Sequence, residues 1–236
     1  MSGSIFSYAL LAALATALLM AAFTDLRRRE IDNWLNAAIA LAAPLWWLAM
    51  GFGWFDMGFQ VGLAVVTFTF ACILFVTGQM GGGDVKLLTA LALWFTPVSF
   101  VQLVVLMAVL GGGASVAMAV FNMKRVRGET LRDGLALLAA LAWIWGAGAI
   151  VYALIMHRPL IGSGTQAAIA SLLPHAWLFG AAILAVILIL AFGFFHIVKR
   201  QKSRLPIPYG IAIAAAGLWV LGEQTLPAAR LAAQTG

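Results

Sequence analysis

Apolar runs long enough to cross a membrane fill most of this sequence and limit what it can fold into. The first three lie at about 5–23, 34–54 and 57–77, with short polar turns between them. A bilayer core is ~30 Å thick and takes about 20 helical residues to cross. Only 9% of the residues are charged, against about 25% in soluble domains. The sequence therefore predicts an all-α polytopic membrane protein.

About eight transmembrane helices are predicted in total. Beyond the first three, apolar segments lie at about 85–95, 98–121, 135–156 and 176–198, and a last one ends near Leu221. The segment at 85–95 is stopped by Pro97 and would cover only roughly 17 Å as a helix. It is therefore expected to be a short or tilted crossing, or a re-entrant piece.

Basic residues predict the orientation of these helices. If the loop carrying Arg27, Arg28 and Arg29 is cytoplasmic and the spans alternate, then of the 14 Lys and Arg residues only Arg158 and Arg230 fall outside. Cytoplasmic loops of membrane proteins carry such an excess of basic residues. We therefore expect both termini on the outer side of a bacterial inner membrane, and the loops after the first and third spans in the cytoplasm.

Two aspartates stand at the cytoplasmic ends of predicted spans. Asp25 ends the first span, and Asp84 follows Gly81, Gly82 and Gly83 after the third. A carboxylate beside an apolar segment and three consecutive glycines in a helical protein are both unfavourable choices. Taken alone, Asp84 could equally be a helix N-cap after an ordinary loop. The second aspartate at the same membrane face favours a functional site.

A pair of carboxylates can hydrolyse a peptide bond. Two close acids do not both ionise readily, so they share a proton. One then acts as a base on water while the other donates a proton to the carbonyl or the leaving amine. A glycine-rich backbone beside them allows an extended peptide to approach closely. The two aspartates therefore predict an aspartic endopeptidase.

Three motifs resemble those of the membrane aspartic proteases that process type IV prepilins and archaeal preflagellins. Gly81-Gly82-Gly83-Asp84-Val85-Lys86 resembles the family's Gly-x-Gly-Asp signature. Asp25-Leu26-Arg27-Arg28-Arg29-Glu30-Ile31-Asp32-Asn33 resembles its first-aspartate segment, and Pro208-Tyr209-Gly210 resembles the opening of its last span. Together the three motifs, in this order, are far more specific than Gly-x-Gly-Asp alone. The likeness covers roughly 5–121 and 205–221.

This resemblance implies a function and a catalytic pair. Asp25 and Asp84 would cut the short basic leader of a type IV prepilin after a glycine, at the cytoplasmic face. The chain reaches Asp25 without the cysteine-bearing insert of the family's long branch, and Cys72 is its single cysteine. It is therefore most similar to the short branch found with Flp/Tad pili, which lacks the methyltransferase domain.

The resemblance also implies the residues that contact the substrate. They are expected to be Gly81, Gly82, Gly83, Lys86, Glu30, Asn33, Pro208, Tyr209 and Gly210. Glu30 would help to attract the basic leader, together with Asp32. The expected partners are the prepilin, membrane lipid and pilus-assembly proteins. No cofactor, metal ion or nucleic acid is expected.

Two departures from the family pattern stand out. Asp32 occupies the place where the family usually has proline. The segment 124–204 looks like an insertion of two extra spans in a single membrane domain, whose peptidase core would be 1–123 and 205–225. Two spans are an even number, so the last helix would keep the orientation that the family gives it.

Two other functions are alternatives to the peptidase. An ion- or proton-coupled transporter would place a carboxylate near the middle of the membrane and show a repeat between its halves, and the sequence shows neither. A non-catalytic scaffold of pilus assembly would tolerate the loss of either aspartate.

Among the aromatic residues, Trp46, Trp47 and Trp54 are expected to form an outer interfacial belt.

Overall fold

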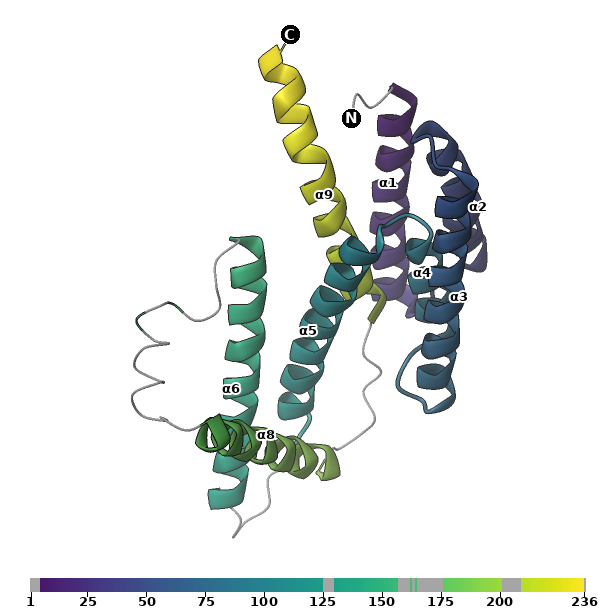
Figure 1. Cartoon of the computed structure of the whole chain (residues 1–236). Helices are drawn as coiled ribbons and strands as arrows, with labels where there is room; N and C mark the ends of the chain where they lie inside the picture. Colours follow the sequence, from purple (N-terminus) through teal and green to yellow (C-terminus); the bar gives the residue numbers. More distant parts are fainter. Residues whose placement is uncertain are drawn as a thin grey trace. The chain divides into compact units, whose positions relative to one another are not determined.

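The computed structural model describes residues 5–124, 130–156, 162, 164, 176–200 and 209–235, and its regular elements are α-helices (Figure 1). The predicted all-α class is confirmed. The helices are α1 (Ile5–Arg28), α2 (Asn33–Ala49), α3 (Trp54–Val76), α4 (Gly82–Ala92), α5 (Pro97–Phe121), α6 (Thr130–Ile155), α8 (Ala176–Lys199) and α9 (Tyr209–Thr235). Among the residues described, α1, α3, α5 and most of α6 are long and apolar enough to cross a membrane.

Each predicted apolar segment corresponds to a helix, with two differences at the ends. The short helix α4 begins at Gly82, so two of the three glycines belong to its first turn. The last helix, α9, continues to Thr235, beyond the end near Leu221 that the apolar pattern predicted.

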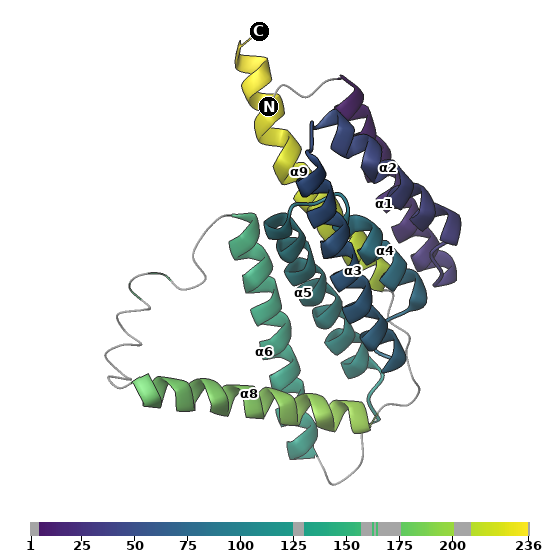
Figure 2. The same cartoon turned by 45° about the vertical axis from the view of Figure 1, so that its right-hand side comes forward.

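The chain forms two compact units, of which the first carries all three motif segments. This unit comprises Met1–Ala108 and Pro208–Gly236, and the second comprises Val109–Ile207. In the first unit, α4 contacts α2, α3 and α9, while α1 contacts α2 and α9 (Figures 1 and 2). The short helix α4 therefore packs against three other helices.

Burial of α4 follows from its sequence. Leu87, Leu91 and Ala92 have no exposed surface, and Phe95 just beyond the helix is 1% exposed. A helix that is apolar on all sides is stable only when other helices cover it. These side chains make α4 the core of the first unit, with Asp84 in its first turn.

The C-terminal end of α4 lies inside the protein, and side chains of neighbouring helices satisfy carbonyl groups there. The indole Nε1 of Trp47 on α2 donates to the Leu93 carbonyl at 2.7 Å. The amide Nε2 of Gln60 on α3 donates to the Phe95 carbonyl at 3.1 Å. Trp94 returns a bond of 2.8 Å to the Ile39 carbonyl on α2. Carbonyls left unpaired in an apolar interior would each cost free energy.

Trp47 corrects the predicted aromatic belt. Its side chain is 7% exposed, whereas Trp54 is 91% exposed. An indole in an interfacial belt lies against lipid headgroups, so the prediction is wrong for Trp47. A buried carbonyl satisfies its N–H instead.

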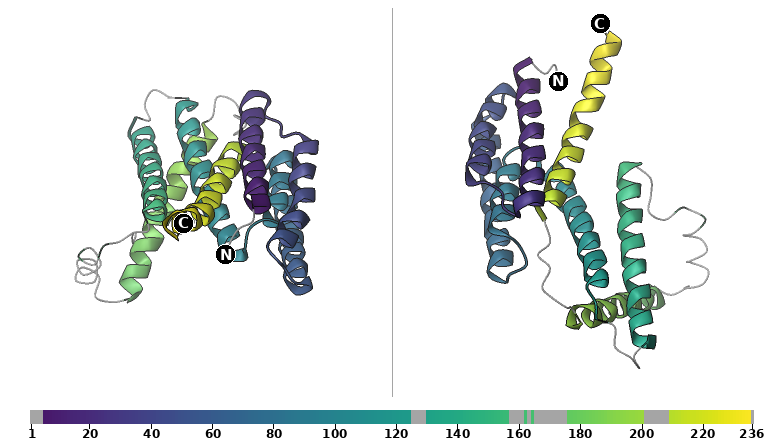
Figure 3. Two further views of the ribbon diagram at one scale, coloured as in Figure 1. Left: turned by 90° about the horizontal axis from the view of Figure 1, so that it is seen from above. Right: turned by 180° about the vertical axis from the view of Figure 1, so that it is seen from behind.

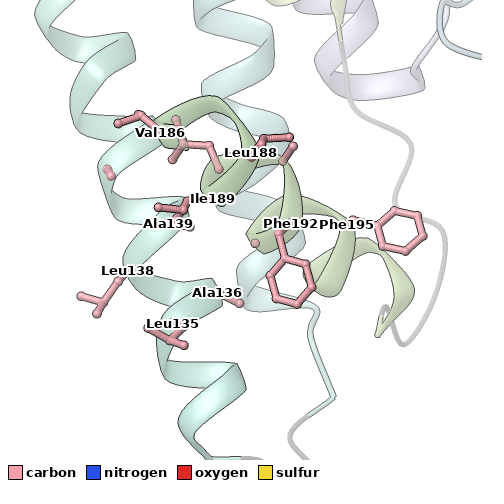
Figure 4. A pocket seen from close by; sticks show the side chains of 13 residues that line it. Leu135, Ala136, Leu138, Ala139, Val186, Leu188, Ile189, Phe192 and Phe195 are labelled. Carbon is pink, nitrogen blue, oxygen red and sulfur yellow. The ribbon is translucent and has the colours of Figure 1, made fainter. Parts of the chain in front are cut away.

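The second unit contains α6 and α8, which contact and cross each other (Figure 3). The two helices pack tightly at Gly193, where an added Cβ would meet the Cβ of Ala139. Asp133 on α6 is buried and pairs with His196 at 3.0 Å and with Arg200 at 3.7 Å, both from the α8 side. An apolar groove of about 1060 Å³ also lies between the two helices, lined only by apolar residues (Figure 4).

The bond from Trp47 to the end of α4 predicts a stability difference between two adjacent tryptophans. Trp47→Phe keeps most of the buried ring but leaves the Leu93 carbonyl without its donor, at an expected cost of about 1–3 kcal/mol. Trp46→Phe is the matched control, because Trp46 stacks on Trp94 with ring centroids 6.0 Å apart, an arrangement that phenylalanine can keep. Thermal unfolding in detergent should show the larger loss for Trp47→Phe. Equal losses would contradict the proposed capping role.

Candidate active site

Asp25 lies at the C-terminal end of α1 and is buried, with 5% of its surface exposed. The helix ends at Arg28. Arg29 then takes a left-handed conformation with φ of 57°, and its N–H donates to the Asp25 carbonyl at 2.8 Å. A non-glycine residue seldom adopts a positive φ. This turn ends α1 about one helical turn beyond the aspartate.

The N-terminus of α9 meets the Asp25 side chain. The N–H of Ile211 donates to Oδ2 of Asp25 at 3.2 Å. The first N–H groups of a helix have no partner within the helix, and the helix dipole places partial positive charge there. The start of α9 is therefore a favourable place for a carboxylate.

Gly210 makes this approach sterically feasible. A Cβ added at Gly210 would lie 2.7 Å from Oδ2 of Asp25 and 2.8 Å from Cδ1 of Ile31. Both distances are shorter than any ordinary contact, so only glycine fits without displacement of a neighbour.

Asp84 lies in the first turn of α4 and is 8% exposed. The Gly81 N–H donates to its Oδ2 at 3.3 Å. Asp84 stands outside the four helices long enough to cross a membrane. Burial raises the pKa of Asp84, and the charge of the nearby Asp25 raises it further. The hydrogen bond from the Gly81 N–H lowers the pKa, and the net result is a pKa of about 6. The two predicted aspartates are thus close enough for their charges to interact.

Ile31 joins the motif segments, although the sequence reasoning gave it no role. It is 7% exposed. An added Cβ at Gly83 would lie 3.2 Å from its Cβ, and one at Gly210 would touch its Cδ1. One isoleucine after the α1 turn therefore packs against the glycine before Asp84 and the glycine beside Asp25. Its place in the first-aspartate segment was the only sequence signal for it.

Other predicted substrate-contact residues surround this centre or lie at its surface. Lys86 Nζ donates to Asn33 Oδ1 at 2.7 Å, which ties α4 to the start of α2. Glu30 is exposed and Tyr209 is half-buried. Gly82 faces the Phe75 ring, whose nearest atom would be 3.5 Å from an added Cβ. Pro208 lies outside the described residues.

Asn36 is a further polar side chain beside the glycine stretch that the sequence reasoning missed. It lies in α2 and is only 4% exposed. Its Nδ2 donates to the Gly83 carbonyl at 3.4 Å. Asn36 stands one helical turn after Asn33, so the two asparagines share a face of α2 toward α4.

The centre combines two buried carboxylates with two helix N-termini and few flanking side chains. Such an arrangement can hold one negative charge and one proton between the acids. It can therefore supply a base and an acid to the same reacting group.

Comparison with known proteins gives one match. Residues 12–116 match the type IV leader peptidase family, a stretch that includes both aspartates and the three glycines. Neither the curated proteins nor the solved structures contain a match to this chain. This match confirms the resemblance inferred from the motifs over residues 12–116, which are similar to the type IV leader peptidase family.

Proposed function

We propose that this protein is a membrane aspartic endopeptidase that uses Asp25 and Asp84 to remove the leader of a prepilin. The observation that carries the proposal is the pair itself. Two buried carboxylates from α1 and α4 lie close enough for the charge of one to raise the pKa of the other. The family match supports the peptidase class. The assignment of these two residues as the catalytic pair is our own.

The proposed reaction divides the two roles of the pair. Asp25 accepts an N–H bond from Ile211, so we assign it as the ionised base that takes a proton from water. Asp84, whose pKa of about 6 lies well above the ordinary 3.8, is assigned as the acid: in its protonated form it gives a proton to the carbonyl oxygen as the water oxygen adds to the carbonyl carbon. The intermediate then collapses: the C–N bond breaks, the leaving amine takes from Asp25 the proton that came from water, and a hydroxyl of the intermediate returns its proton to Asp84.

The proposed substrate is a short basic leader of the Flp/Tad type, cut after a glycine at the cytoplasmic face of the inner membrane. Exposed Glu30 and half-exposed Asp32 flank the centre and can attract a basic peptide. Their effect is expected to be small, because exposed charges are screened by salt. We also propose that Gly81, Gly82, Gly83, Lys86, Asn33, Tyr209 and Gly210 line the path of the peptide.

Replacing either aspartate tests the catalytic pair. Asp25→Asn and Asp84→Asn should each abolish cleavage of a co-expressed prepilin, because asparagine can neither accept nor donate the required proton. Asp56→Asn is the matched control. Asp56 accepts the Gly53 N–H at 3.1 Å at the start of α3, much as Asp84 accepts that of Gly81.

The readout is the shortened pilin on a gel, at equal membrane levels of all variants. Full cleavage by Asp56→Asn and none by the other two would support the pair. Cleavage that survives in either catalytic variant would refute it.

The glycines predict a graded series of activities. Gly210→Ala should lower the cleavage rate by roughly 100-fold, because its methyl group must displace the Asp25 carboxylate or Ile31, and misplacing a catalytic group by about 1 Å can cost that much. Gly53→Ala should retain most of the rate, since Gly53 lies outside the proposed peptide path and its methyl group would make ordinary contact with the Asp56 carboxylate at 3.5 Å. Initial rates on a purified prepilin measure both. Equal effects would show that the packing around Gly210 does not position Asp25.

The raised pKa of Asp84 predicts a pH-dependent gain in stability for Asp84→Asn. Its pKa is about 6 in the folded protein against an ordinary value of 3.8. Between these values the folded state binds more protons, so the wild type loses stability as pH rises. The gain of the variant should therefore grow from about pH 4 to pH 7, to at most roughly 3 kcal/mol. Thermal unfolding in detergent measures it, and a pH-independent difference would contradict the burial of an ionisable Asp84.

A further inference from the structure

Asn36 presents an unexplained polar group next to the proposed catalytic centre. The side chain is 4% exposed. Its Oδ1 is buried and has no hydrogen-bond partner among the residues that the structure describes. An unsatisfied buried acceptor costs about 1–3 kcal/mol, and such groups are few in native proteins. The position of Asn36 therefore calls for a function that offsets this cost.

The orientation of the amide is fixed by the glycine stretch. The Nδ2 group donates to the Gly83 carbonyl, and an inverted amide would place two oxygens against each other. Oδ1 is consequently held beside the backbone that leads from Gly83 to Asp84. An amide oxygen only accepts hydrogen bonds, so the missing partner must be a donor.

A peptide substrate brings such a donor. A helical peptide hides its scissile bond, so the segment at the catalytic pair must be extended. An extended main chain in apolar surroundings exposes N–H groups that need acceptors, and enzymes that bind extended peptides supply them. A buried acceptor adjoining the residue before Asp84 meets this need.

We propose that Asn36 binds the substrate main chain: Nδ2 stays on the Gly83 carbonyl while Oδ1 accepts a peptide N–H next to the scissile bond. This inference rests on the proposed peptidase function. It assigns a role to Asn36, a residue that lies outside the three sequence motifs. Asn36 would take part in binding and leave the proton transfers to the two aspartates.

Gln60 provides a matched control within the same unit. It too is 4% exposed, donates its Nε2 to a carbonyl and carries a buried oxygen without a partner among the described residues. Its bond goes to Phe95, beyond the end of α4 opposite Asp84. Gln60→Leu therefore removes an equivalent buried amide without touching the proposed peptide path.

The test combines enzyme variants with ester-substituted substrates. A series of synthetic prepilin peptides is used. Each peptide carries a single ester in place of one peptide bond, at one of the three positions before or the three positions after the scissile bond. The ester removes one N–H without added bulk. We expect one ester to lower kcat/KM of the wild type by about 10-fold, the worth of one such hydrogen bond. Asn36→Leu should lower kcat/KM of the all-amide peptide similarly, and the same ester should then have no further effect.

The outcomes separate this inference from the proposed function. If the ester lowers kcat/KM of Asn36→Leu as much as that of the wild type, Asn36 does not bind the missing N–H. If the ester also has no further effect in Gln60→Leu, the loss of its effect is not specific to Asn36. Either result would overturn the role of Asn36 while leaving the peptidase intact. If Asn36→Leu does not accumulate in membranes, the wild-type enzyme is tested on the ester series alone. Equal cleavage rates for all ester peptides would then overturn the inference. A wild type that does not cleave the all-amide peptide would refute the proposed function, and the role of Asn36 with it.

Discussion

The end of α4 is the constraint on which the rest of the first unit depends. An apolar helix of 11 residues is too short to span a bilayer core, so its end must be satisfied inside the protein. Trp47 from α2 and Gln60 from α3 provide the donors. Because the donors come from two helices, the depth and rotation of α4 are fixed, and so is Asp84 at its other end.

The two carboxylates depend on helix N-termini for their placement. Asp84 stands in the first turn of α4 and Asp25 accepts the Ile211 N–H at the start of α9. Two adjacent buried acids repel each other when both are ionised. The partial positive charge at the two helix ends offsets part of that repulsion, while burial and the Asp25 charge keep a proton on Asp84 below about pH 6. The backbone N–H groups of Gly81 and Ile211 therefore serve both the packing of the helices and the proposed chemistry.

The helices and the two aspartates could be predicted from the sequence because polar residues and glycines differ clearly from the apolar residues around them. A carboxylate or a run of glycines stands out in a chain that is 64% hydrophobic. Ile31 does not, because one more isoleucine carries no signal until its neighbours are known. Trp47 was misassigned because an indole suits either a membrane interface or a buried carbonyl. Asn36 was missed because its significance lies in its contact with Gly83.

The glycines acquire a second role once the packing is known. The sequence reasoning valued them for the approach of a substrate, yet Gly83 and Gly210 also leave room for Ile31 and, at Gly210, for Asp25. Ile211 and Asp25 are 186 residues apart, with the whole second unit between them in sequence. The cost of closing such a loop rises only slowly with its length. The insertion expected between α5 and α9 is therefore compatible with the proposed catalytic centre as long as the chain returns α9 to the same membrane face, as an even number of added spans would do.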